Sequence, residues 1–77
     1  MSVDKLKEML ELLRYYNTVE ITHTFRHGDQ PFLSVCCLKN TITFQITNIE
    51  EQTVHHYNCL EEAAIAIEKL ISFRKPS

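Results

Sequence analysis

The chain has 77 residues, a formal net charge of -2, 44% hydrophobic residues and one glycine. This length suits a single domain over residues 1–77, and this apolar content excludes a wholly disordered chain. A single glycine cannot build a phosphate-cradling loop, and an acidic chain on average repels a nucleic-acid backbone. The composition therefore predicts a small globular domain that binds no nucleic acid.

The first predicted element is a helix over residues 3 to 15 or 16. Ser2 can cap its N-terminus, and Asp4 lies in the first turn, where the helix dipole favours negative charge. Apolar residues then recur at spacings of three and four, which indicates an amphipathic helix with one buried face. These residues are Val3, Leu6, Met9, Leu10 and Leu13.

Three strands are predicted next, over residues 18–25, 32–38 and 41–48. The apolar period changes to two, with Val19, Ile21 and Phe25 on one side of the first strand. The segment 27–31 contains Gly28 and Pro31 and is the strongest turn signal of the chain.

Only Lys39 and Asn40 separate the second and third predicted strands, which indicates a two-residue hairpin loop with Asn40 at positive φ. This loop length sets a register in which every inward pair is apolar. The predicted pairs are Cys37 with Ile42, Val35 with Phe44, and Leu33 with Ile46.

Residues 53–57 are predicted as a short fourth strand, and its pairing is left open. Asn58 and Glu61 match a capping box for a second helix that ends before Pro76. Its buried stripe contains Leu60, Ala63, Ala64, Ile67, Leu70 and Ile71. The expected fold class is α+β, an antiparallel three- or four-stranded β-meander flanked by an N-terminal and a C-terminal helix.

The order of these elements resembles the YkuJ-like family of small uncharacterised bacterial proteins. The likeness rests on the Gly-containing turn before Ser34 and Val35, the hairpin at residues 39–41 and the strand with Phe44, over roughly residues 20 to 72. The resemblance implies an antiparallel sheet with flanking helices and a bacterial source. It implies no activity and carries over no functional residue.

The cysteines Cys36, Cys37 and Cys59 form a poor disulfide framework, because their number is odd and two are adjacent. The first residues show no secretory apolar run, and no stretch approaches the roughly 20 apolar residues of a membrane helix. We therefore expect a protein of the reducing cytoplasm, with no membrane partner.

Neither a metal nor a cofactor is predicted, because His23, His27, His55 and His56 supply no close pair of ligands with the cysteines. Cys59 is the candidate reactive thiol, since it lies near a helix N-terminus, where a thiolate is stabilised. The acidic residues just after it oppose that role. We expect no catalytic residue, and a thiol-dependent enzyme or redox protein remains an alternative.

The leading hypothesis is a non-catalytic protein–protein interaction module that forms a homodimer or binds another protein. One candidate surface is the outer sheet face, which is poor in charge; its candidate interface residues are Phe32, Cys36, Thr43 and Gln45. The other is Ile65, which points about 160° away from the buried stripe of the second helix. A nucleic-acid-binding sheet is a further alternative, for which Phe32 is the single stacking residue.

Overall fold

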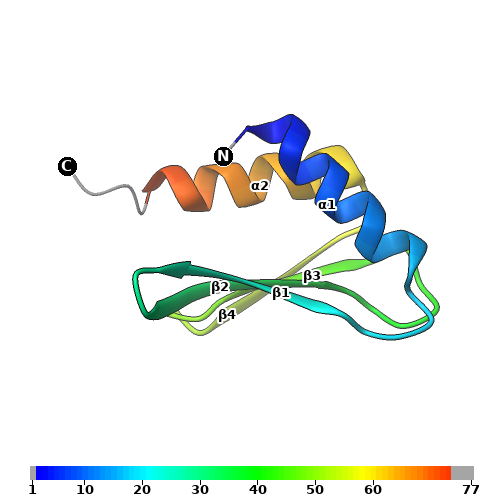
Figure 1. The fold of residues 1–77 in the computed structure, drawn as a ribbon, viewed down its shortest axis with the longest axis horizontal. Helices are drawn as coiled ribbons and strands as arrows, with labels where there is room; N and C mark the ends of the chain where they lie inside the picture. The colour runs from blue at the N-terminus through cyan, green and yellow to red at the C-terminus, as the bar shows by residue number, and fades with distance from the viewer. Residues whose placement is uncertain (1, 74–77) are drawn as a thin grey trace.

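The computed structural model describes residues 2–73. In chain order the elements are α1 (Val3–Tyr15), β1 (Thr22–His27), β2 (Gln30–Cys37), β3 (Phe44–Asn48), β4 (Thr53–Tyr57) and α2 (Leu60–Phe73) (Figure 1). This is the predicted α+β fold, and the fourth strand pairs with β3 at one edge of a single sheet. The expected stop of the second helix at Pro76 lies outside the described residues.

The four strands form an antiparallel meander in the order β1-β2-β3-β4. Both helices lie on the same side of this sheet, so the molecule has two layers (Figure 1). Helix α1 packs against α2 and β2, and α2 reaches β3 and β4. Within residues 2–73 neither helix has the length and apolarity needed to cross a membrane.

The hydrophobic core lies between the helices and the inner face of the sheet. The predicted stripes supply it, because the same spacing that makes a helix amphipathic aims these side chains at one face. The fully buried side chains are Leu6 and Leu10 of α1, Leu33, Val35, Cys37, Phe44 and Ile46 of the sheet, and Ala63, Ala64 and Ile67 of α2.

Each helix begins near its predicted cap. The hydroxyl of Ser2 accepts a hydrogen bond from the backbone N–H of Lys5, at 3.3 Å. The capping box at Asn58 is wrong by one residue, because α2 begins at Leu60. Asn58 Oδ1 instead accepts a hydrogen bond from the Thr43 hydroxyl, at 2.8 Å, so its side chain joins two loops rather than capping the helix.

The predicted hairpin register is wrong by two residues. Cys37 pairs with Phe44 and Val35 with Ile46, so β3 begins at Phe44. The Leu38 N–H donates to the carbonyl of Thr43 at 2.9 Å, so the loop between the strands contains the four residues 39–42 instead of two. A shift of two preserves the faces, since the side-chain period of a strand is two. Ile42, however, moves from the core into the turn and is 59% exposed.

The first strand begins at Thr22, four residues later than predicted. Thr22 pairs with Cys36, and β2 ends one residue later at Cys37, so residues 18–20 lie beyond the end of β2 and have no partner on that strand. They lie instead against the turn between β2 and β3, where Glu20 accepts a hydrogen bond from the Lys39 N–H at 3.1 Å. Consequently Val19 and Ile21 are exposed.

We predict that Phe44→Asp abolishes folding, while Ile42→Asp leaves the protein folded. Phe44 is fully buried, and an unpaired carboxylate in the core costs several kcal/mol, comparable with the stability of a small domain. Ile42 is largely exposed, so its replacement introduces a solvated charge. Thermal melts followed by circular dichroism separate the variants. A cooperative melt for Phe44→Asp, or an unfolded Ile42→Asp, would contradict the observed register.

Arg14 ties the end of α1 to two loops beneath it. Its Nη2 atom donates to the carbonyl of Ile42 at 3.2 Å and to the carbonyl of Asn58 at 3.0 Å. The guanidinium also lies over the Phe44 ring, 4.8 Å from the centroid. One side chain therefore fixes the β2–β3 turn and the β4–α2 connection to the same helix.

Arg14→Met is expected to lower the free energy of unfolding by about 1–2 kcal/mol, because it removes two hydrogen bonds and a cation–π contact from a half-buried position. Urea denaturation measures the loss. Lys5→Met is the matched control, since it removes the same charge from an exposed position on the same helix. Equal stability of the two variants would show that the Arg14 contacts contribute nothing.

Candidate functional site

The outer face of the sheet, away from both helices, carries an uncharged and Thr-rich surface. Strand pairing places eight side chains on it: Thr22, Thr24, Ser34, Cys36, Gln45, Thr47, Val54 and His56. His56 Nε2 and Gln45 Oε1 are hydrogen-bonded across β3 and β4, at 3.2 Å. Cys36 and Gln45, two of the predicted interface residues, therefore do lie side by side on this face.

The other predicted interface residues lie elsewhere. Phe32 is only 7% exposed and belongs to the core, not to the outer face. The cause is a β-bulge: Phe25 pairs with Leu33 but Arg26 pairs with Pro31, so Phe32 is the extra residue of β2 and the strand alternation breaks there. Thr43 precedes β3 and bonds to Asn58 at the end of the sheet.

The thiols of Cys36 and Cys37 are buried and free. Burial raises the pKa of the Cys36 thiol, and the nearby carboxylate of Glu20 raises it further. Burial also raises the pKa of Cys37, against a smaller lowering effect of Arg14. Both side chains therefore stay protonated near neutral pH, which makes them poor nucleophiles.

Cys59 is exposed and lines an open hollow between the end of α1 and the start of α2. The other side chains around this hollow are Glu11, Arg14, Tyr15, Leu60 and Glu61. No histidine is among these lining residues, and His55 lines a different groove. Among the described residues, the side chains around Cys59 in this hollow therefore include two carboxylates and no imidazole.

We predict that 5,5′-dithiobis(2-nitrobenzoic acid) modifies one thiol quickly in the native protein and the other two only on unfolding. Cys59 is exposed, whereas Cys36 and Cys37 are buried with raised pKa values. Absorbance at pH 8 follows the reaction, and Cys59→Ser should remove the fast phase. A fast phase that survives in Cys59→Ser would contradict the burial of the sheet thiols.

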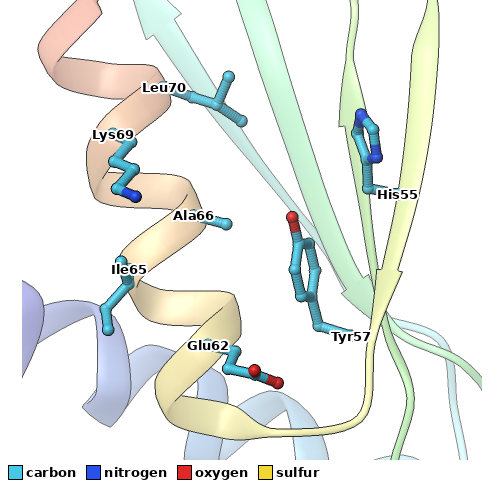
Figure 2. Close-up of a pocket in the computed structure, with 7 residues that line it drawn as sticks. All are labelled: His55, Tyr57, Glu62, Ile65, Ala66, Lys69 and Leu70. Carbon is cyan, nitrogen blue, oxygen red and sulfur yellow. The ribbon is translucent and has the colours of Figure 1, made fainter.

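An apolar groove of about 420 Å³ separates strand β4 from helix α2. The helix contributes Ile65, Ala66 and Leu70, and the strand contributes Tyr57, whose ring extends toward the helix (Figure 2). The groove also has polar walls, formed by His55, Glu62 and Lys69. Ile65, which the sequence placed off the buried stripe, is 45% exposed and lies at this groove.

The groove borders an open edge of the sheet. β4 is the last strand in the order, so its outer row of backbone N–H and C=O groups pairs with no strand of the sheet. Proteins usually protect such edges with charges, proline or bulges. β1, the other edge, carries Arg26 and the register shift, whereas β4 has no Asp, Glu, Lys or Arg, no proline and no shift.

The histidines do not assemble with the cysteines. His23 packs edge-on against Phe25 in β1, and His55 and His56 point to opposite faces of β4. Within residues 2–73 no three His, Cys, Asp or Glu side chains lie where they could hold a metal ion together. The proposal that the protein carries no metal remains to be tested by elemental analysis.

A scan against protein-family models and searches of curated proteins and of solved structures find no match to this chain. The resemblance to the YkuJ-like family therefore stays a prediction. Function has to be inferred from the surface of the molecule itself.

Proposed function

We propose that this protein is a small, non-catalytic protein–protein interaction module of the cytoplasm, and that its docking surface is the β4–α2 groove. The observation that carries the proposal is the position of an apolar groove beside an unprotected sheet edge. Such a pair of features is typical of β-augmentation, in which an added strand bonds to the edge and its side chains enter an adjoining pocket.

The two features supply different parts of recognition. The backbone of β4 can bond to any extended segment, so it contributes affinity without selecting a sequence. The groove accepts an apolar side chain against Tyr57, Ile65 and Leu70, while Glu62 and Lys69 offer charges at its walls. A partner is therefore expected to present an extended segment to the edge of β4 and apolar side chains to the groove.

The alternatives receive less support. A nucleic-acid-binding sheet needs exposed aromatic residues and cations, and Phe32, its single predicted stacking residue, is buried in the core. A thiol enzyme needs a base or cation that activates Cys59. The hollow around Cys59 is lined by the carboxylates of Glu11 and Glu61, and its cation, Arg14, already donates to two backbone carbonyls.

The test uses a photo-crosslinking residue, p-benzoylphenylalanine, at position 65 of the full-length protein in the cell. We expect ultraviolet light to yield a protein adduct, which mass spectrometry of the crosslinked peptides identifies. The comparison site is Leu12 on α1, which is 59% exposed and lies outside the groove. Adducts at position 12 but not at 65, or none at either, would overturn the proposal.

A further inference from the structure

We infer that the occupant of the β4–α2 groove is a second copy of this chain, related to the first by a two-fold axis beside β4. The inference rests on the proposed function, since it names the partner of the same groove. It is carried by the charge pattern of α2 at the groove and by the open edge of β4.

Four of the groove residues follow one another along a single stripe of α2. They are Glu62, Ile65, Ala66 and Lys69, at the i, i+3, i+4 and i+7 spacing that faces one direction on a helix. The acidic residue is at one end, the basic residue is at the other, and the two apolar residues are in the middle. This stripe is separate from the buried one that contains Ile67.

Such a stripe is complementary to itself in the antiparallel direction. A two-fold axis passing between Ile65 and Ala66 sets Glu62 of each copy opposite Lys69 of the other, and the apolar pairs meet at the axis. Because of the two-fold symmetry, this ion pair occurs twice in the dimer. The parallel arrangement would oppose like charges instead. Among the described residues Glu61 pairs with Lys7 at 3.7 Å, whereas Glu62 and Lys69 take part in no ion pair and remain available.

The same axis also serves the open sheet edge. Because β4 and α2 border one groove, a two-fold rotation normal to the sheet brings β4 antiparallel to its copy while the helices pair above it. The unpaired backbone groups of both edges are then bonded, and the sheet continues through the dimer. An unrelated peptide could bond to the edge, but it would have no reason to match Glu62 and Lys69 in this order.

The decisive experiment reverses each charge separately. In Glu62→Lys both positions are basic, and in Lys69→Glu both are acidic, so each variant repels its own copy at two places. We expect the wild-type protein to be dimeric at micromolar concentration. Each variant should raise the dissociation constant of the dimer about 30-fold, because it loses two exposed ion pairs of ordinary strength. Analytical ultracentrifugation measures the masses, and circular dichroism verifies that each variant folds.

Mixing the two variants should restore the dimer, because the two basic positions of one variant then face the two acidic positions of the other. The double variant Glu62→Lys with Lys69→Glu should also dimerise, since it only exchanges the two ends. Glu8→Lys and Lys5→Glu are the matched controls, because they reverse the same charges at exposed positions of α1. They should leave the mass of the dimer unchanged.

Two results would overturn the inference. A wild-type protein that is dimeric but insensitive to both reversals and to mixing uses a different surface. A wild-type protein that is monomeric at all concentrations has no second copy in the groove. In either case the crosslink at position 65 still decides the proposed function, because an adduct with a different protein would support the groove as a docking site and exclude self-association.

Discussion

The rest of this structure depends on one constraint: a four-stranded sheet has to be covered by two helices that both lie on the same face. Helix α1 occupies the side of β2, and α2 reaches across β3 to β4. The core side chains therefore have to point to one side, and the outer face becomes a surface of mostly small polar residues. The layer of helices also ends beside β4, where α2 leaves an apolar groove rather than a closed core.

To cover this end of the sheet, α1 has to hold two loops beneath it, the β2–β3 turn and the β4–α2 connection. Arg14 does this by bonding to the carbonyls of Ile42 and Asn58 while it stacks on Phe44. Asn17 adds to this attachment, since its side chain donates to the carbonyl of Thr41 and its own carbonyl accepts from the Asn40 N–H. These contacts explain why the segment after α1 lies against a turn instead of extending β1.

Two groups of side chains bear on function: the buried thiols, which are unreactive, and the exposed apolar side chains. Cys36 and Cys37 are buried thiols with raised pKa values, so they behave as small core and sheet residues. The exposed apolar side chains are more informative about function. A domain this small has little buried surface of its own, so covering an apolar patch adds relatively much to its stability. Ile65 stands out among them, since it lines the groove beside the unpaired edge of β4. Of the two surfaces predicted from the sequence, Ile65 is therefore the one that lies at this groove.

The sequence by itself determined the elements and their faces, because amphipathic periods of 3.6 and two record which side of each element is buried. The stripe of α2 and the inward positions of Leu33, Val35 and Phe44 follow from those periods alone. A register error of two residues left them intact for the same reason. Tertiary structure decided the rest: the length of the turn between β2 and β3, the bulge that moves Phe32 into the core, and the groove that α2 and β4 line together. Each depends on contacts between different elements, which the period within one element cannot encode.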